Sequence, residues 1–247
     1  MTNHSADYFL TIVVPIFNEE ESLPRLVSAL QDYKSKASVK LCVLLVNDGS
    51  ADGSLNLIKQ ACAQDKDFFY LSLAHRCGLT GALKAGFTHA ASPWCGYIDA
   101  DLQTFPEDFE LLLPHVHEAA LICGIRAKRH DSWSKKIQSK IANKIRNAVT
   151  HDGFSDTNCP LKIIDTKLAK ALPLFSGMHR FLPALTLLFG QQVVAVPVRH
   201  QERLQGKSKF NLFNRGLSGL CDLFAFIWMR RRFVNPQVGE QNLEQKD

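Results

Sequence analysis

Residues 94–103 read Trp-Cys-Gly-Tyr-Ile-Asp-Ala-Asp-Leu-Gln, an apolar strand pattern that ends in two aspartates separated by one alanine. In an extended backbone the side chains of residues i and i+2 point to the same side, so the carboxylates of Asp99 and Asp101 can converge on one divalent cation. A cation held there could in turn bind a pyrophosphate group. A solvated turn after a strand can carry the same pattern, so the motif alone leaves a structural role open.

Apolar segments rich in β-branched residues alternate with helical patterns in the first part of the chain. Strands are predicted for residues 10–16, 40–46, 69–73 and 94–98, and helices for residues 20–33, 53–64 and 79–91. This alternation predicts an α/β fold in which a mostly parallel central sheet is flanked by helices. Ligands of such sheets bind beyond the carboxyl ends of the strands, where Asp48 and Asp99 both fall.

The composition is that of a globular protein. With 247 residues, 46% of them hydrophobic, the chain can bury a sizeable core as one large domain or as one domain with an appendage. Its seven cysteines are odd in number and form no Cys-x-x-Cys pair, which favours a reducing cytosol over a disulfide framework or a zinc site. The first seven residues hold no basic-then-apolar run, so no secretory signal is expected.

The net charge of +5 is unevenly distributed. Residues 128–146 contain seven lysines and arginines, and residues 230–232 are three arginines. Such clusters can be a solvated helix face, a surface for anionic membranes or a nucleic-acid contact. No zinc-finger or RNP-like pattern occurs in the chain, so no nucleic-acid partner is expected.

The turn Asn47-Asp48-Gly49-Ser50 follows the second predicted strand. These residue types favour turns on their own account, but the Asp48 carboxylate could also accept hydrogen bonds from a base or a ribose. Glu19 or Glu20 could serve in the same way from the first loop. The chain has no Gly-x-x-x-x-Gly-Lys-Ser/Thr loop and no Gly-x-Gly-x-x-Gly turn, so a metal at the Asp-x-Asp pair is the expected way to hold phosphates.

Four motifs occur in consistent order between about residues 11 and 233. They are Val13-Val14-Pro15-Ile16-Phe17-Asn18-Glu19-Glu20, Val46-Asn47-Asp48-Gly49-Ser50, Asp99-Ala100-Asp101-Leu102-Gln103 with Pro106, and Arg203-Leu204-Gln205-Gly206-Lys207-Ser208-Lys209-Phe210. Together they resemble the family-2 inverting glycosyltransferases, and among these the dolichol-phosphate mannosyltransferase-like enzymes that load a sugar onto a polyprenyl phosphate. Further positions resemble the bacterial branch of that group: Gly124-Ile125-Arg126, Arg129, Asp131, Ser139, Asn143, Asp156, Cys159 and His179-Arg180-Phe181-Leu182-Pro183.

The resemblance implies a nucleotide-sugar-binding domain of the GT-A type, dependence on Mg²⁺ or Mn²⁺, and a lipid phosphate acceptor. Carried over by position, it implies that the nucleotide is bound by Pro15, Asn18, Glu19 and Asp48. The metal and the diphosphate would be held by Asp99, Asp101 and Gln103, and phosphate oxygens near the reacting centre by Arg126, Arg203, Ser208 and Lys209. One loop departs from the pattern, because relatives usually carry an Asn and a Lys where this chain reads His75-Arg76-Cys77-Gly78-Leu79-Thr80-Gly81.

The residue types fit a reaction that needs cations more than a base. The second pKa of a phosphomonoester is about 6, so an acceptor phosphate is largely a dianion at neutral pH. A divalent metal can neutralise the departing nucleoside diphosphate, while arginines and lysines align two phosphates that repel each other. The catalytic candidates are Asp101, Arg126, Asp156 and Arg203. Asp156 occupies the position of a possible base in relatives, and the alternatives are that it positions a ligand or a cation, or that it caps a turn.

Residues 217–229 are strongly apolar, are interrupted by Asp222 and are followed by three arginines. This run is shorter than the roughly 20 residues that a membrane-spanning helix needs. One prediction is a helix in the membrane interface whose apolar side is formed by Phe213, Leu217, Leu220, Phe224 and Trp228. The alternative is a helix packed on the domain or on a second subunit.

The predicted organisation is a GT-A domain over residues 1–209, an amphipathic interfacial or dimer helix over residues 210–233, and a disordered tail over residues 234–247. Within the domain, a nucleotide-binding half is expected at about residues 8–118 and an acceptor half at about residues 119–209.

The main hypothesis is an enzyme of the cytoplasm, bound peripherally to the cytoplasmic face of the inner membrane. It would transfer a sugar with inversion from a UDP- or GDP-linked donor to an undecaprenyl- or dolichyl-type polyprenyl phosphate, for cell-envelope glycoconjugates. A homo-oligomer is left open. The alternatives are a family-2 glycosyltransferase with a soluble or polysaccharide acceptor, and a non-enzymatic module that binds a nucleotide sugar or an anionic lipid.

Overall fold

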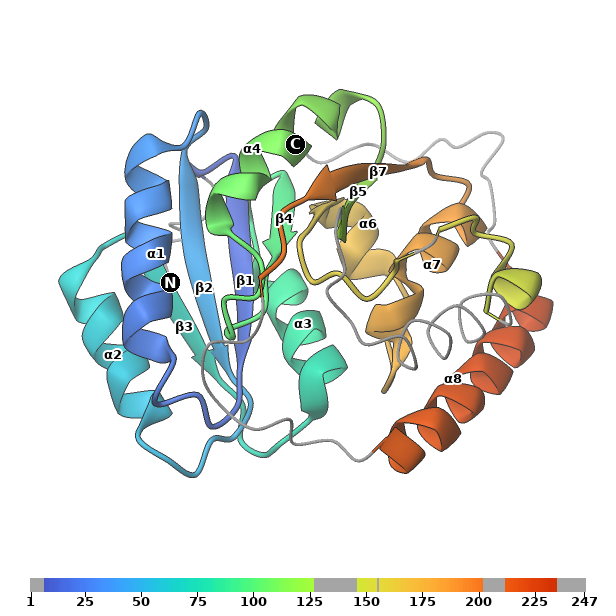
Figure 1. Cartoon of the computed structure of the whole chain (residues 1–247), viewed down its shortest axis with the longest axis horizontal. Coiled ribbons are helices and arrows are strands. Elements are labelled where there is room, and N and C mark those ends of the chain that lie inside the picture. Colours follow the sequence, from blue (N-terminus) through green and yellow to red (C-terminus); the bar gives the residue numbers. More distant parts are fainter. Residues whose placement is uncertain (1–6, 127–145, 155, 202–211, 235–247) are drawn as a thin grey trace, which may run out of the picture.

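The apolar segments of the chain form one mixed sheet of seven strands, in the spatial order β3-β2-β1-β4-β6-β5-β7 (Figure 1). The computed structural model describes residues 7–126, 146–154, 156–201 and 212–234, with the backbone alone described for residues 212–218. The strands are β1 (Leu10–Ile16), β2 (Leu41–Asn47), β3 (Phe68–Ser72), β4 (Trp94–Tyr97), β5 (Leu121–Arg126), β6 (Lys162–Asp165) and β7 (Val193–Val198).

Helices cover both faces of the sheet. They are α1 (Leu23–Lys36), α2 (Ser54–Gln64), α3 (Gly78–His89), α4 (Phe109–Leu112), α6 (Thr166–Ala171), α7 (Leu182–Leu188) and α8 (Leu212–Arg232), with the short 3-10 helices η2 (Pro106–Asp108), η3 (Leu113–His117) and η4 (Met178–Phe181). One hydrophobic core joins α1, α2 and α4 to one face of the sheet, and a second joins α3, α6, α7 and α8 to the other. The predicted α/β class, with a mostly parallel central sheet flanked by helices, is confirmed.

β1 illustrates why these segments become central strands. Its residues Leu10, Ile12 and Val14 enter the first core, while Val13 enters the second. Parallel strands that are covered by helices on both faces need such continuous apolar runs. The following helix begins at Leu23 rather than at residue 20, because Pro24 stands in its first turn, where a missing N–H is tolerated.

Strand direction decides which strand ends meet. β1, β2, β3 and β4 run parallel to one another, β6 is antiparallel to both β4 and β5, and β7 is parallel to β5. Six strands therefore end, and β6 begins, along one side of the sheet, which is its carboxyl edge. This edge faces the lower side of the view in Figure 1.

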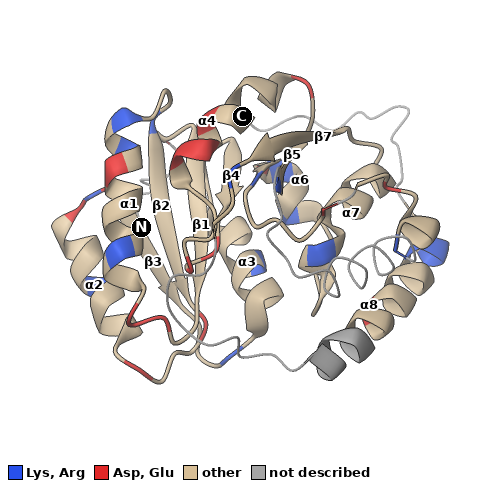
Figure 2. Cartoon of the chain, viewed as in Figure 1, with Lys and Arg blue, Asp and Glu red and all other residues tan. Residues whose placement is uncertain are grey.

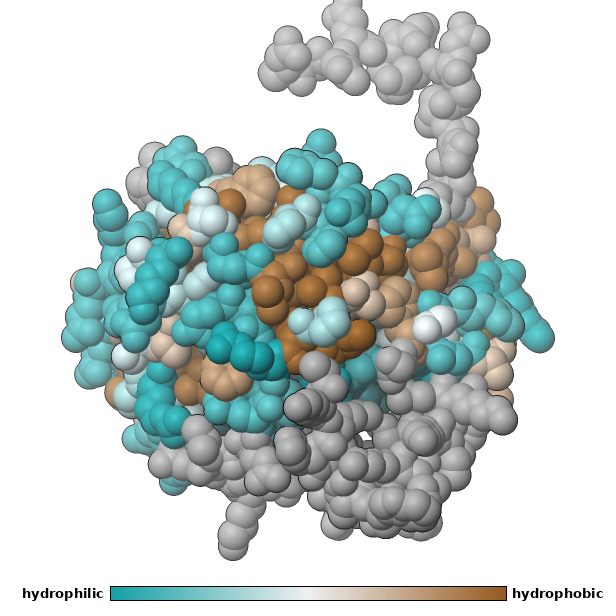
Figure 3. Space-filling model, turned by 45° about the horizontal axis from the view of Figure 1, so that its top comes forward, coloured by the Kyte–Doolittle hydropathy of each residue, from teal (hydrophilic) through white to brown (hydrophobic). Residues whose placement is uncertain are grey.

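β7 is the outermost strand on the side of β5. Ala195 and Pro197 are exposed on it, and Pro197 has no backbone N–H to offer to a further strand. Figure 3 brings the top of the molecule forward and shows hydrophobic residues gathered across the middle of that face. A proline in an edge strand opposes pairing with the edge of another molecule.

The C-terminal helix α8 packs on the domain through one of its sides. Leu223, Phe226 and Met229 are buried in the second core, and Asp222 accepts a hydrogen bond of 2.9 Å from Arg180. Of the helices in the described ranges, none has the length and apolar character needed to cross a membrane.

Candidate active site

The carboxyl edge brings together most of the site residues expected from the sequence. Pro15 lies near the end of β1, with Asn18 and Glu19 in the loop that follows, and Asp48 comes directly after β2. Asp99, Asp101 and Gln103 follow β4, while Arg126 ends β5 and Asp156 precedes β6. Figure 2 shows acidic residues in the loops at this edge below β1, β2 and β3. Arg203, Ser208 and Lys209 lie outside the described residues.

The two aspartates after β4 are held by hydrogen bonds from their own segment. The Tyr97 hydroxyl donates to Asp99 Oδ1 at 2.7 Å, and the Gln103 backbone N–H donates to Asp101 Oδ1 at 3.1 Å. Leu102, between Asp101 and Gln103, has a φ of +54°, a left-handed conformation that is rare for a residue with a branched side chain. The turn after β4 is therefore strained, and its neighbours must hold it in place.

The loop after β7 supplies that support. Gln201 donates from its side-chain Nε2 to the Leu102 carbonyl at 2.6 Å and from its backbone N–H to the Gln103 carbonyl at 3.0 Å. Arg199 anchors the same loop, because it donates from Nε to Asp108 at 2.7 Å and lies 4.4 Å from the centre of the Phe105 ring. Neither Arg199 nor Gln201 was expected at the site, since nothing in the sequence around them indicates a partner about a hundred residues away.

Tyr97 was also missed, although it lies two residues before Asp99 and so on the same side of the strand. Burial and, next, the adjacent Asp99 carboxylate raise the pKa of Tyr97 well above its ordinary value of 10.0. The phenol therefore keeps its proton and acts as a permanent donor that orients Asp99.

The donor set at this turn fits a hard divalent cation. Two carboxylates and the Gln103 side-chain amide supply oxygen ligands, which Mg²⁺ and Mn²⁺ prefer. In the part of the chain that the structure describes, no three His, Cys, Asp or Glu side chains come together as a metal cluster. Magnesium sites commonly use one or two carboxylates and take their remaining ligands from substrate phosphates and water, so the pair suits a metal bound together with a diphosphate.

The first two loops of the edge are clamped to each other. Asn18 has a φ of +52°, and its Oδ1 accepts a hydrogen bond of 2.8 Å from the backbone N–H of Ala51. The backbone N–H of Glu19 donates to Ser54 Oγ at 2.9 Å. Asn18 and Glu19 thus fix the shape of the expected nucleotide-binding surface, and their contact with a nucleotide stays a prediction.

Asp48 anchors the start of α3. Its two carboxylate oxygens accept the backbone N–H groups of Cys77 at 2.6 Å and of Gly78 at 2.8 Å, and the residue is 3% exposed. A carboxylate at a helix N-terminus pairs with the unsatisfied N–H groups of the first turn. A structural role for Asp48 is therefore present, and a further bond to a base or ribose stays a prediction.

The loop that departs from the family pattern lies directly on the turn after β2. A Cβ on Gly49, which has a φ of +67°, would stand 2.9 Å from the backbone N of Arg76. The Arg76 guanidinium lies 4.1 Å from the centre of the Phe17 ring. This loop therefore presents a cation beside the predicted nucleotide site.

Arg126 and Asp156, two of the catalytic candidates, bind each other. Arg126 Nε and Nη2 donate to the two Asp156 oxygens at 2.6 and 2.7 Å, and the side chains are 16% and 9% exposed. A carboxylate gripped by a guanidinium is a weak proton acceptor. This pairing favours the positioning role of Asp156 over base catalysis.

A polar contact joins helix α3 to the short helix η4. Burial first, and then the charges of Arg180 and Lys162, lower the pKa of His179 from 6.5 to about 3, so its ring is neutral. His179 Nδ1 lies 2.7 Å from Thr80 Oγ1, which also accepts the backbone N–H of Gly177 at 3.1 Å. The Thr80 hydroxyl thus contacts both His179 and Gly177, and η4 is tied to α3.

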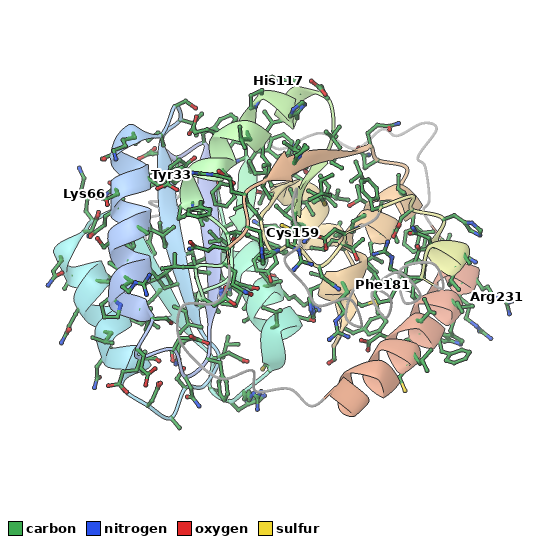
Figure 4. All side chains as sticks on the ribbon, in the orientation of Figure 1. Tyr33, Lys66, His117, Cys159, Phe181 and Arg231 are labelled. Carbon is green, nitrogen blue, oxygen red and sulfur yellow. The ribbon has the colours of Figure 1, made fainter. Side chains whose placement is uncertain are left out.

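A separate hollow of about 630 Å³ opens at the opposite edge of the sheet. Its lining includes Trp94 at the start of β4, Asp165 at the end of β6, and His117, which Figure 4 labels at the top of the view. This hollow lies away from the residues described above.

Comparison with known proteins gives both a family match and a fold match. The family model described as Glycosyl transferase family 2 matches residues 11–172. The structure is similar to crystal structures of glucosyl-3-phosphoglycerate synthase from Mycobacterium tuberculosis. The complex with Mn²⁺, UDP and glucosyl-3-phosphoglycerate has a TM-score of 0.67 at 12% identity, covering 96% of this chain and 85% of that one. The complex with Mg²⁺ and UDP has a TM-score of 0.68 at 14% identity, with the same coverage. At such identities the likeness shows a shared fold.

Proposed function

This chain belongs to glycosyl transferase family 2, and we propose that it transfers a sugar, with inversion, from a nucleotide-sugar donor to a polyprenyl phosphate. The observation that carries the proposal is the arrangement at the carboxyl edge. The expected oxygen ligands Asp99 and Asp101 follow β4, and the cation Arg126 ends β5 on the other side of β6. The metal held at Asp99 and Asp101 would stabilise the departing diphosphate, and the positive charge of Arg126 would stabilise the incoming phosphate.

The donor side rests on Asp99, Asp101 and Gln103 as holders of Mg²⁺ or Mn²⁺. The metal, when bound, would neutralise the charge that develops on the leaving nucleoside diphosphate. Tyr97 and the Gln103 N–H keep the two carboxylates oriented. Crystals of the structurally similar synthase contain Mn²⁺ or Mg²⁺ together with UDP, which supports a UDP-linked donor as the first to test.

The acceptor side rests on cations. An acceptor phosphate oxygen forms a bond to the anomeric carbon while the bond from that carbon to the diphosphate oxygen breaks, and its electron pair leaves with the nucleoside diphosphate. No proton must be removed from a phosphate dianion, so no strong base is required. Arg126, held by Asp156, would stabilise the acceptor phosphate, and the sequence places Arg203, Ser208 and Lys209 in the same role.

A polyprenyl phosphate resides in a bilayer, so this function includes peripheral attachment to the cytoplasmic face of the inner membrane. A second acceptor class is supported by one observation. The similar structures are named for a synthase that acts on a phosphoglycerate, which is a soluble compound that also bears a phosphate. Both classes would use the same cations, so they have to be separated by experiment.

The test is a transfer assay with the purified chain and Mg²⁺ or Mn²⁺. A panel of UDP- and GDP-sugars is offered with a short polyprenyl phosphate or with 3-phosphoglycerate, and products are identified by mass. We expect a sugar-phosphate-prenyl product that disappears with a chelator. Sugar found on the soluble acceptor alone would overturn the lipid acceptor, and absence of any product with intact nucleotide-sugar binding would favour the non-enzymatic module.

An Asp101→Asn variant keeps the shape of the side chain and removes its charge. We expect turnover to fall by about a hundredfold or more, as for loss of other groups that stabilise transition-state charge. The same change at Asp32, an exposed residue of α1, serves as the matched control and should leave turnover unchanged.

A further inference from the structure

The outward side of α8 carries large apolar side chains that the rest of the described chain leaves uncovered. Phe224 is 70% exposed, Trp228 64% and Leu220 48%. With 3.6 residues per turn, these three positions fall within about 80° of one another around the helix. We call Leu220, Phe224, Trp228, Arg231 and Arg232 the outer face of α8.

The opposite side of the same helix is fixed to the domain. Phe226 is 1% exposed and stacks on Phe181 with ring centres 5.2 Å apart, and Figure 4 shows Phe181 on the inner side of α8. Asp222 accepts a hydrogen bond from Arg180 at 2.9 Å. The outer face is therefore presented by a helix that is already held in place, and its apolar side chains have no role in this packing.

Basic residues complete the outer face. Arg231 and Arg232 are exposed at the end of α8, where Figure 4 labels Arg231, and the Arg232 guanidinium lies 5.5 Å from the centre of the Trp228 ring. A tryptophan beside arginines, with a phenylalanine one turn away, is typical of helices that lie at a membrane interface. Apolar side chains enter the acyl boundary there, and cations meet the headgroups.

From these observations we propose that the outer face of α8 docks on an anionic lipid bilayer. The proposal deepens the proposed function by naming the surface that would bring the carboxyl edge to a lipid acceptor. It rests on the proposed function for the reason to bind lipid, whereas binding itself is tested separately. In Figure 1 the first turn of α8 and the carboxyl edge both face the lower side of the molecule.

Charge favours a bilayer over a second copy of the chain. In the described part of α8 the one acidic side chain is Asp222, which is bound to Arg180 on the inner side. Two outer faces placed against each other would bring arginines together with no carboxylate from this helix to pair with them. Anionic headgroups supply the missing negative charge.

The test measures binding of the whole chain to phosphatidylcholine vesicles with and without phosphatidylglycerol, by co-sedimentation in the absence of donor and acceptor. We expect binding to the vesicles that contain phosphatidylglycerol, and weaker binding as salt rises. Phe224→Ser with Trp228→Ser should weaken it by at least about tenfold. Arg231→Glu with Arg232→Glu should weaken it by roughly fivefold or more for each residue.

Matched controls keep the result specific. Leu111→Ser changes a side chain that is 46% exposed on α4, and Arg25→Glu changes an exposed arginine on α1. Both should bind vesicles as the unchanged chain does. Circular dichroism and thermal unfolding show whether each variant remains folded.

The proposal is overturned if the unchanged chain does not bind vesicles that contain phosphatidylglycerol. It is overturned as well if the folded double variant at Phe224 and Trp228 binds these vesicles as tightly as the unchanged chain. It is also overturned if the chain is a dimer without vesicle affinity and the double variant is a monomer, since the outer face is then a subunit interface. None of these results depends on sugar transfer, so failure here and failure of the proposed function are separate outcomes.

Discussion

Three of the carboxylates along the carboxyl edge differ in what holds them, and this difference helps to separate their roles. Asp99 accepts a hydrogen bond from the phenol of Tyr97, which orients its carboxylate. Asp48 is held by two backbone N–H groups, which makes it part of the framework. Asp156 accepts two hydrogen bonds from the guanidinium of Arg126, which favours a positioning role. The side-chain type alone does not distinguish these cases.

Replacing Tyr97 by Phe tests the orienting bond to Asp99. The ring still fills its buried position, but the hydroxyl that donates at 2.7 Å is lost. Loss of a hydrogen bond that orients a metal ligand commonly lowers metal affinity by tenfold or more, so we expect the Mn²⁺ concentration for half-maximal activity to rise by about tenfold. Tyr33→Phe removes a comparable hydroxyl bonded to Glu110 and should leave this concentration unchanged. Equal effects in both variants would contradict the assignment.

His179 predicts a dependence of stability on pH. Its pKa is about 3 in the folded chain and 6.5 in its ordinary state, so the unfolded chain binds more protons as the pH falls between these values. The stability contributed by the neutral ring is present above pH 6.5 and is lost toward pH 3, at about 1 kcal/mol per pH unit. Urea unfolding at several pH values should show this slope, and His179→Asn should reduce it. An identical slope in the variant would refute the prediction.

At the scale of elements, the first four strands could be predicted from the local sequence, whereas the later strands and their pairing could not. β1, β2, β3 and β4 could be predicted to within one or two residues, because each is a mostly apolar run followed by a loop. β5, β6 and β7 were not singled out, and the reversal of β6 depends on pairing with strands that are distant in sequence. The pairing of Arg126 with Asp156, thirty residues apart, was beyond prediction for the same reason.

Gly49 tests how closely the loop after β3 lies on the turn after β2. Gly49 has a φ of +67°, and a Cβ added to it would stand 2.9 Å from the Arg76 backbone. Gly153 has a similar φ of +72°, but a Cβ added to it would have nothing within 4 Å. Gly153→Ala should lower the free energy of unfolding by only about 1 kcal/mol, the penalty for an alanine in the left-handed conformation. Gly49→Ala should lower the free energy of unfolding, measured with urea, by about 1 to 3 kcal/mol more than this, because the loop that contains Arg76 must move. Equal costs would mean that the loop yields without penalty.

Two phenylalanines on α8 give a second comparison. Phe226 is 1% exposed and Phe224 is 70% exposed. Phe226→Ala should lower the free energy of unfolding by about 3 kcal/mol or more, since it leaves a cavity against Phe181. Phe224→Ala should change it by less than about 0.5 kcal/mol. A large loss at Phe224 would show that the outer face contributes to folding.

At the scale of the whole molecule, one sheet carries both the proposed donor-side and the proposed acceptor-side residues. Asp99 and Asp101 follow β4, which has parallel β1 on one side and antiparallel β6 on the other. The two substrates would therefore meet where the sheet changes direction. Ligand binding there should stabilise the entire fold rather than one lobe.

Metal removal tests this view through thermal unfolding. UDP with Mn²⁺ should raise the unfolding temperature, and at about a hundredfold excess over Kd the gain is about 2.7 kcal/mol. A chelator should remove most of the shift, because the diphosphate loses its link to Asp99 and Asp101. An Asp99→Asn variant should behave with Mn²⁺ as the unchanged chain does without it. A full shift in the presence of chelator would argue against a metal-held diphosphate.

The reversed direction of β6 has a consequence for how this scaffold can diversify. The chain leaves the carboxyl edge at Arg126 and returns to the same edge at Lys162. Asp156, in the connection between these strands, already contacts Arg126, so side chains of this connection can line the proposed acceptor side. Changes of sequence there could alter which acceptor is used while β1, β2 and β4 keep the proposed donor side unchanged.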